Sequence, residues 1–199
     1  MKKNLIFALL APLLKKSYFT AAEVRELGVS TAKLAYYVNQ GLIQRMSRGV
    51  YKSPQHEPCL QTFPWDDLLE TSYLVPGGVI CLISALALHE ITEEIPRTHW
   101  IAISHSTSSK KRKGVKIMRF RNMDLGKTVM TVGKSQVPIF NQERTIIDVF
   151  RFLSHETAIK ALKMALMKKG KEALNLKLLY EYGWKLKCNI APYLLAITT

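Results

Sequence analysis

Two closely spaced helix-start signals near the N-terminus constrain the fold more than any other feature of this sequence. Thr20 and Glu23 have the spacing of a capping box, in which the hydroxyl and the carboxylate bind free backbone N–H groups at a helix start. Ser30 is a second favourable N-cap, and Gly28 before it suits the left-handed turn that ends a helix. The predicted helices cover residues 21–27 and 31–40.

A basic hairpin follows the second of these helices. Residues 42–46 and 50–52 are β-prone, and the turn Ser47-Arg48-Gly49 joins them with an arginine at its tip. The apolar run Leu5–Leu14 has helical spacing and predicts a short helix ahead of Thr20. Two short helices around a glycine turn, followed by such a hairpin, indicate a winged helix-turn-helix. We expect this domain to span residues 1–53.

The second predicted helix has one apolar side and one side suited to reading DNA. Its apolar side consists of Leu34, Tyr37 and Val38. Asparagine and glutamine can bind adenine through two hydrogen bonds, and lysine suits guanine or phosphate. The expected contacts are Lys33, Tyr36, Asn39 and Gln40 on the helix and Arg45, Arg48 and Lys52 on the hairpin. Two alternatives stay open: a merely solvated helix face, and a helix-turn-helix that binds protein.

The charge distribution favours a polyanionic partner. The chain carries 29 Lys and Arg against 15 Asp and Glu, a formal net charge of +14. Arg97–Lys134 contains ten basic residues and the single acid Asp124. One loop in this stretch concentrates them, at Lys110, Lys111, Arg112 and Lys113. We expect these four to make auxiliary phosphate contacts, with a solvated loop as the alternative.

A second domain is expected after a proline-rich linker at 54–64, over residues 65–199. Helical periods at its two ends enclose β-prone segments, which predicts an α+β domain with a small, mostly antiparallel sheet flanked by helices. The expected helices cover 66–73, 79–91, 143–153, 156–167 and 176–184, and an apolar tail follows at 190–197. The expected strands cover 99–104, 115–121, 128–132 and 136–140.

The cysteines and the N-terminal apolar run favour a cytoplasmic protein. Cys59, Cys81 and Cys188 are far apart and lack metal-ligand spacing, so neither a disulfide framework nor a zinc site is expected. The apolar run at the N-terminus is too short to span a bilayer. It lacks a small-residue cleavage site, which argues against a signal peptide. We expect no membrane association.

No standard catalytic motif is present, so we expect a protein that is not an enzyme and needs no cofactor or metal. His89 and Glu93 fall on one face of a predicted helix, but two ligands are too few for a metal site. Arg144 and Asp148, four residues apart on another helix, predict an ion pair. A metal-dependent nuclease remains an alternative, with its acids at Asp66, Asp67, Glu90 and Glu93.

Four segments in order resemble the AbiEi antitoxins of type IV toxin-antitoxin systems, which act in abortive infection against phage. They are YFTAAEVRELGVSTAKLAYYVNQGLIQRMSRGVYK (18–52), PGGVICLISALALHEIT (76–92), IPRTHWIAIS (95–104) and QERTIIDVFRF (142–152). The similarity covers roughly residues 5–170 and leaves 171–199 uncovered. The first segment alone is typical of many winged helices, and the order of all four makes the resemblance more specific.

This resemblance implies a bacterial repressor and antitoxin. The winged helix would bind inverted repeats of double-stranded DNA in its own promoter, as a monomer or weak dimer that binds cooperatively. The other domain would counteract a nucleotidyltransferase toxin encoded next door, with or without a stable complex. By motif position the resemblance adds Ser30 and Thr31 to the DNA contacts. Glu143, Arg144, Thr145 and Asp148 lie in the last segment, which we interpret as structural. A stand-alone winged-helix regulator with a ligand- or partner-sensing domain is the main alternative.

Overall fold

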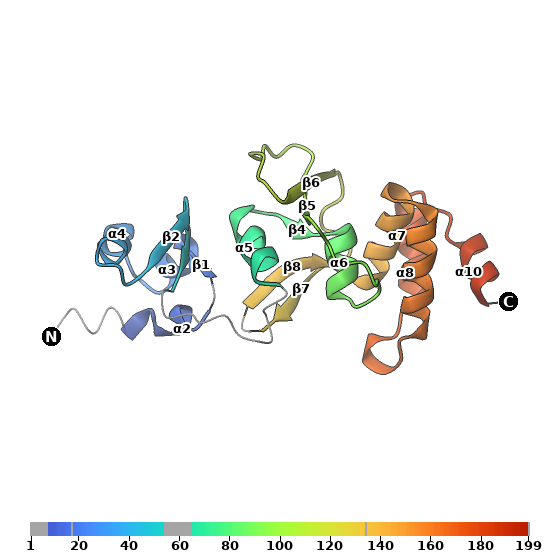
Figure 1. Cartoon of the computed structure of the whole chain (residues 1–199), viewed down its shortest axis with the longest axis horizontal. Helices are drawn as coiled ribbons and strands as arrows, with labels where there is room; N and C mark the ends of the chain where they lie inside the picture. The colour runs from blue at the N-terminus through green and yellow to red at the C-terminus, as the bar shows by residue number, and fades with distance from the viewer. Residues whose placement is uncertain (1–7, 17, 54–64, 134, 199) are drawn as a thin grey trace. The chain divides into compact units, whose positions relative to one another are not determined.

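The computed structural model describes residues 8–16, 18–53, 65–133 and 135–198 (Figure 1). Contacts divide the chain into two compact units, each considered by itself below. The first unit is Met1–Pro76 with Met130–Val137, and the second is Gly77–Val129 with Pro138–Thr199. The domain limits expected from the sequence remain a prediction, since the linker 54–64 lies outside the described residues.

The first unit contains the winged helix that the sequence predicts. In chain order its elements are α2 (Ala11–Leu14), β1 (Tyr18–Thr20), α3 (Ala21–Glu26), α4 (Thr31–Asn39), β2 (Gln44–Ser47) and β3 (Val50–Lys52). The strands form a three-stranded sheet in the order β1-β3-β2, with antiparallel pairs and an irregularity between Arg45 and Ser47. Strand β1 was not predicted, because three residues are too few to show an alternating pattern.

The residues that the sequence identifies as helix caps form the ends of α3 and the start of α4. Thr20 Oγ1 accepts a hydrogen bond from Glu23 N at 3.3 Å, and Glu23 Oε2 accepts one from Thr20 N at 2.7 Å. Ser30 Oγ accepts from Lys33 N at 3.3 Å at the start of α4. Gly28 has a φ of +76°, and its N–H donates to Arg25 O. The capping predictions are therefore confirmed. The caps and the turn at Gly28 end α3 and start α4 within a few residues, so that a tight turn joins the two helices.

A small apolar core holds the winged helix together. Leu34 and Tyr37, the buried side of α4, are 1% and 3% exposed. They belong to a cluster with Leu10, Leu13, Phe19, Val24, Val29 and Ile43. Helix α5 (Asp66–Leu74) adds to this unit, since the Tyr18 hydroxyl donates to Glu70 Oε2 at 3.1 Å and the rings of Tyr18 and Tyr73 lie 5.5 Å apart. Burial and the nearby Glu70 carboxylate raise the pKa of Tyr18.

The second unit is built on a five-stranded sheet, with one helix between its first two strands in the chain and further helices after the last strand (Figure 1). Its strands, in the spatial order β6-β5-β4-β8-β7, are β4 (Val79–Ile80), β5 (His99–Ser104), β6 (Val115–Phe120), β7 (Lys127–Val132) and β8 (Ser135–Phe140). The hairpin end of β7 and β8 counts with the first unit. The helices are α6 (Leu82–Leu88), α7 (Gln142–Phe152), α8 (His155–Met167), η2 (Gly170–Glu172), α9 (Leu176–Lys185) and α10 (Ala191–Thr198). The α+β class is confirmed.

Strand direction in this sheet differs from the expected, mostly antiparallel arrangement. Strand β4 pairs antiparallel with β5 but parallel with β8, and β5 pairs parallel with β6. In the β5–β6 pair His99 lies opposite Val115, and His99 N donates to Gly114 O at 2.8 Å. The polar loop 105–114 therefore carries the chain back along β5 before β6 begins, because parallel strands require a crossover.

The apolar stretch Val79–Ile91, predicted as one helix, is a strand followed by a shorter helix. Val79 and Ile80 pair with Ala102 and Ile101 in the sheet, and α6 begins at Leu82. Leu82 has a φ of +48°, a conformation that bulky residues rarely adopt. A continuous apolar run fits a buried strand as well as a buried helix, so hydrophobic pattern alone could not separate the two.

Candidate nucleic-acid interface

The outer face of α4 presents the polar side chains that the sequence assigns to DNA contact. Thr31, Tyr36, Asn39 and Gln40 are exposed, while Lys33 is half-buried. They share this face because Leu34 and Tyr37 hold the opposite side of the helix in the core. Ser30 is also exposed, but its hydroxyl oxygen already caps α4 through Lys33 N. The structure thus brings hydroxyl, phenol and amide groups together on one short helix.

The three basic residues of the wing differ in how freely they can move. Arg48 is exposed at the tip, in the tight turn that Gly49 permits with a φ of +81°. Arg45 is exposed, and its Nε donates to Ser47 O at 3.3 Å, which holds the guanidinium along the wing. Lys52 is half-buried, with its Nζ 5.3 Å from the centre of the Tyr18 ring. Arg48 is therefore the cation best placed to reach outward.

Two further exposed residues of this unit belong with the candidate contacts, although sequence reasoning missed them. Arg25 lies in the last turn of α3, the helix that crosses the DNA backbone in helix-turn-helix complexes. Gln44 starts the wing strand β2. Sequence reasoning could not identify Arg25 and Gln44, because the sequence pattern does not tell which side of α3 or β2 faces solvent.

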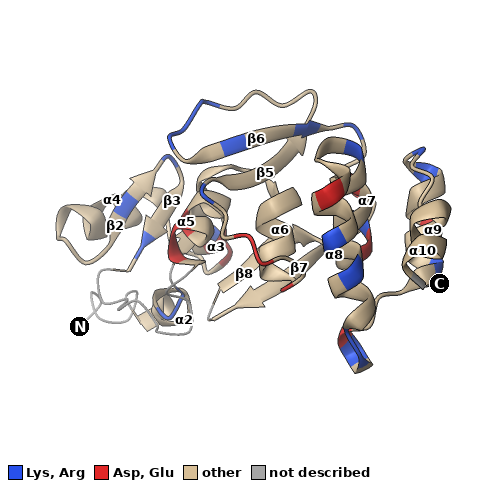
Figure 2. Ribbon diagram, turned by 45° about the vertical axis from the view of Figure 1, so that its right-hand side comes forward, with Lys and Arg blue, Asp and Glu red and all other residues tan. Residues whose placement is uncertain are grey.

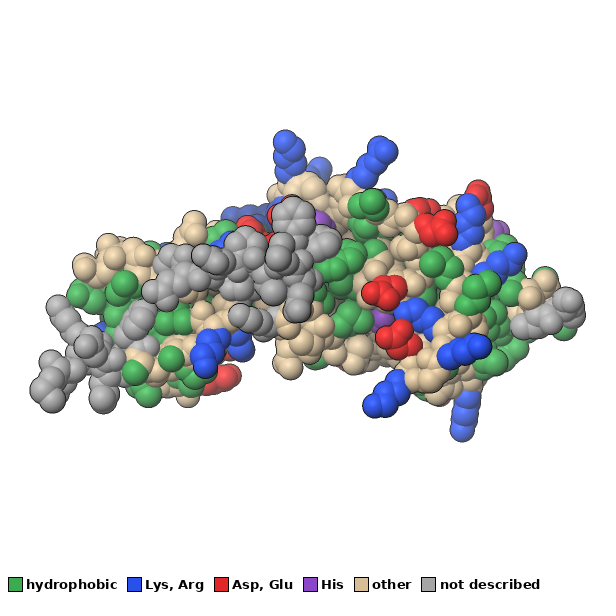
Figure 3. Space-filling view, turned by 60° about the horizontal axis from the view of Figure 1, so that its bottom comes forward, with side chains coloured by type: hydrophobic (Ala, Val, Ile, Leu, Met, Phe, Trp, Pro, Cys, Tyr) green, Lys and Arg blue, Asp and Glu red, His purple; other side chains and the backbone are tan. Residues whose placement is uncertain are grey.

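The basic loop between β5 and β6 belongs to the second unit (Figure 2). Lys110, Lys111 and Lys113 are exposed there, and Arg112 is half-buried. In the later helical part of this unit, lysines pair with acids four residues away, as in Lys160–Glu156 at 2.6 Å and Lys168–Glu172 at 2.9 Å. Figure 3 accordingly shows acidic and basic side chains interspersed on the exposed face of the C-terminal part.

The acids considered for a nuclease do not form a cluster. No group of three or more His, Cys, Asp or Glu side chains with metal-binding geometry occurs among the residues that the structure describes. The expected helix face shared by His89 and Glu93 is not formed, because α6 ends at Leu88 and Glu90 adopts a left-handed φ of +53°. His89 Nε2 instead hydrogen-bonds to Phe140 O at 2.7 Å. Cys81 and Cys188 are free thiols, and burial raises the pKa of Cys81.

We expect His89 to make the second unit sensitive to acid. Burial lowers the pKa of His89, and its hydrogen bond to Phe140 offsets this only in part. A depressed pKa in the folded state means that the stabilising contribution is present above the ordinary value of about 6.5 and is lost as pH falls. We expect the unfolding free energy to decrease between pH 7.5 and 5.

The substitution His89→Gln tests this origin, since the Gln amide can still donate to Phe140 O but does not titrate. It should flatten the decrease, as measured by chemical denaturation at several pH values. The substitution His105→Gln, at an exposed histidine, is the control and should leave the slope unchanged. An equal slope in wild type and His89→Gln would assign the acid sensitivity to other groups.

The segment 142–152 is held by buried hydrogen bonds, as its structural interpretation predicts. Arg144 Nε donates to Asp148 Oδ2 at 2.7 Å, and both side chains are 1% exposed. Arg144 Nη1 also donates to the carbonyls of Asn122 and Leu125, at 3.1 and 2.8 Å. Thr145 Oγ1 donates to Phe140 O at 3.2 Å. The predicted ion pair is confirmed, and its complete burial is what the sequence did not show.

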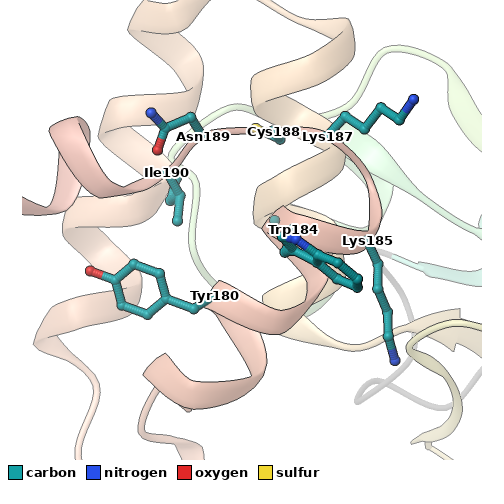
Figure 4. Close-up of a pocket in the computed structure, with 8 residues that line it drawn as sticks. Tyr180, Trp184, Lys185, Lys187, Cys188, Asn189 and Ile190 are labelled. Atoms are coloured by element: carbon teal, nitrogen blue, oxygen red, sulfur yellow. The ribbon is translucent and has the colours of Figure 1, made fainter.

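A hollow of about 760 Å³ lies at the end of α9 (Figure 4). Tyr180, Trp184, Cys188, Asn189 and Ile190 line it together with Lys185 and Lys187. Figure 4 shows the two lysines pointing away from Tyr180 and Ile190. Trp184 is 83% exposed, an unusual exposure for an aromatic side chain of this size.

None of the described helices has the length and apolar character required to cross a membrane.

Comparison with known proteins gives a match for the winged helix. Residues 9–54 match a family model described as "Transcriptional regulator, AbiEi antitoxin". The match includes α4 and the wing and ends before α5. No curated protein matches the chain. The N-terminal segment of the chain is therefore similar to the AbiEi antitoxin transcriptional regulators.

Proposed function

We propose that this protein represses its own promoter by binding inverted repeats and that it counteracts a nucleotidyltransferase toxin encoded beside it. The observation that carries the proposal is the outer face of α4, with Tyr36, Asn39 and Gln40 exposed, inside the segment that matches the AbiEi regulators. The antitoxin role rests on that match and on the sequence resemblance in the second unit. The protein acts by binding rather than by catalysis.

Recognition divides between the helix and the wing. Helix α4 enters the major groove, where Asn39 and Gln40 can each bind the edge of an adenine through two hydrogen bonds. Tyr36 offers a phenol beside them, with its ring 5.7 Å from that of buried Tyr37. Arg48 and Arg45 contact the phosphate backbone from the wing, which adds affinity that depends on salt. Two copies occupy the two repeats, and we expect their binding to be cooperative.

The substitution Arg48→Ala should weaken binding to operator and random duplex alike. Loss of one phosphate contact reduces the slope of log K against log salt by about 1. Fluorescence anisotropy with both duplexes over a range of salt concentrations measures the slope. The substitution Lys163→Ala, at an exposed lysine of α8, controls for the change in net charge. An unchanged slope for Arg48→Ala would remove the wing tip from the interface.

The antitoxin role is tested by growth. The adjacent gene is expressed in bacteria alone and together with this protein, while a promoter fusion reports repression in the same cells. We expect arrest by the neighbour, rescue by this protein and repression of the fusion. A harmless neighbour with intact repression would contradict the antitoxin role and favour the stand-alone regulator.

A further inference from the structure

A second cavity of the second unit, of about 460 Å³, is surrounded by cationic side chains. They come from three places in the chain: β6 and the residue after it, helix α7, and the end of α9 with the turn that follows. These side chains are Arg119, Arg121, Arg144, Arg151, Lys185 and Lys187. Asp148 and Glu181 are the acids that pair with members of this set. The cavity therefore carries a clear excess of positive charge.

Several of these cations are held in place by the fold. Arg151 Nη1 donates to Asp148 Oδ1 at 2.9 Å, and its guanidinium lies 4.8 Å from the centre of the Phe152 ring. Phe152 stacks on Phe120 at 5.2 Å, which fixes the ring beneath that guanidinium. Arg119 Nη1 donates to Thr107 O at 2.5 Å. A preorganised set of donors binds an anion at a lower entropic cost than flexible side chains do.

Two cations of the cavity have capacity left for a ligand. The side chains of Arg121 and Lys187 are exposed and form no hydrogen bond or ion pair with any residue that the structure describes. Lys187 also has a φ of +55°, at the position after α9 where glycine is normally favoured. Its N–H donates to Trp184 O, and Cys188 N donates to Gly183 O. Lys187 thus occupies a left-handed backbone conformation that is unfavourable for lysine. Non-glycine residues in such conformations cluster at functional sites.

We propose that this cavity binds a nucleotide through its oligophosphate group. Arginine and lysine donors converging on one cavity suit clustered phosphate oxygens, because such hydrogen bonds are assisted by charge. The volume lies in the range of small-molecule pockets. Phe152 and Leu186 provide an apolar side against which a nucleoside can pack. Donors that converge on one cavity suit a single nucleotide better than a long strand, which needs an extended groove.

This site is independent of the proposed DNA contacts, since it lies wholly in the second unit and outside the segment that matches the AbiEi regulators. The test is calorimetric titration of the full chain, without DNA, using ATP, GTP and tripolyphosphate. A single-stranded oligonucleotide forms a separate arm. We expect saturable binding of ATP or GTP that weakens as salt increases. Tripolyphosphate binding with equal affinity would support recognition through phosphates alone, and weaker binding would support an added contact to the nucleoside.

Two variants locate the binding. Arg121→Ala and Lys187→Gly should each raise the dissociation constant at least about tenfold, the effect of one charge-assisted hydrogen bond. Lys187→Gly should at the same time raise the melting temperature, because glycine relieves the left-handed backbone at this position. Lower affinity in a more stable protein separates loss of a ligand contact from loss of folding.

Two control variants complete the design. Lys163→Ala removes one positive charge elsewhere, and Glu90→Gly relieves a similar left-handed residue after α6, so both should retain affinity. The proposal is overturned by absence of saturable nucleotide binding, or by an equal loss of affinity in Lys163→Ala. It is also overturned if the oligonucleotide binds through Arg121 and Lys187 while ATP and GTP do not.

Discussion

The substitution Arg144→Met should lower the unfolding free energy by about 3–5 kcal/mol, the cost of leaving a buried charge without its main partner. Asp148 is 1% exposed and, among the residues that the structure describes, would retain Arg151 as its ion-pair partner, whose side chain is 30% exposed. Arg144 also supplies the donors for Asn122 O and Leu125 O, so its removal leaves these carbonyls without that partner. Chemical denaturation followed by circular dichroism measures the loss.

The pH dependence of this loss identifies its cause. Burial raises the pKa of Asp148, against the opposing effects of Arg144 and Arg151. Removal of Arg144 takes away one of these opposing effects and raises the pKa of Asp148 further. A carboxyl group whose pKa is raised in the folded state destabilises the protein as pH rises. The loss of unfolding free energy in the Arg144→Met variant should therefore be larger at pH 7.5 than at pH 5. A loss that does not vary with pH would point to the carbonyl contacts instead.

An exposed ion pair provides the matched control for Arg144. Lys160 and Glu156 have the same spacing on α8, but their side chains are 70% and 76% exposed. The substitution Lys160→Met should therefore leave the unfolding free energy almost unchanged. If Lys160→Met and Arg144→Met had similar effects, burial of the Arg144–Asp148 pair would not be what makes it important.

The substitution Asn39→Ala should weaken binding to the operator by about 1–3 kcal/mol, or about 5- to 150-fold, while binding to random duplex changes little. Asn39 is exposed at the end of α4, where its amide can bind a base edge. Competition binding of operator against random duplex measures the change in specificity. The expected consequence is loss of discrimination rather than loss of all affinity.

Gln136→Ala is the matched control, since it removes an exposed amide outside α4 and the wing. It should leave operator binding unchanged. Equal losses on operator and random duplex for Asn39→Ala would contradict base recognition by this residue and would suggest a phosphate contact. A loss in both Asn39→Ala and Gln136→Ala would show that neither measurement reports a specific contact.

The winged helix is the part of this protein that local sequence determines. The Thr20 capping box, the Ser30 cap and the turn at Gly28 act within a few residues, so they are visible in the sequence and appear in the structure as predicted. The exposed face of α4 follows directly from helical periodicity. The sequence contains no local pattern that predicts β1, because this strand forms through its pairing with β3.

Tertiary structure decided the rest. Val79–Ile80 become a strand because they pair with β5 and β8, and the same pairing leaves Leu82 to begin α6. The polar loop 105–114 returns the chain to the start of β5, so β6 runs parallel to it. The cationic cavity gathers residues more than sixty positions apart, from Arg119 to Lys187. Backbone pairing and the convergence of distant charges depend on contacts between segments, and a local pattern of residue types carries no record of those contacts.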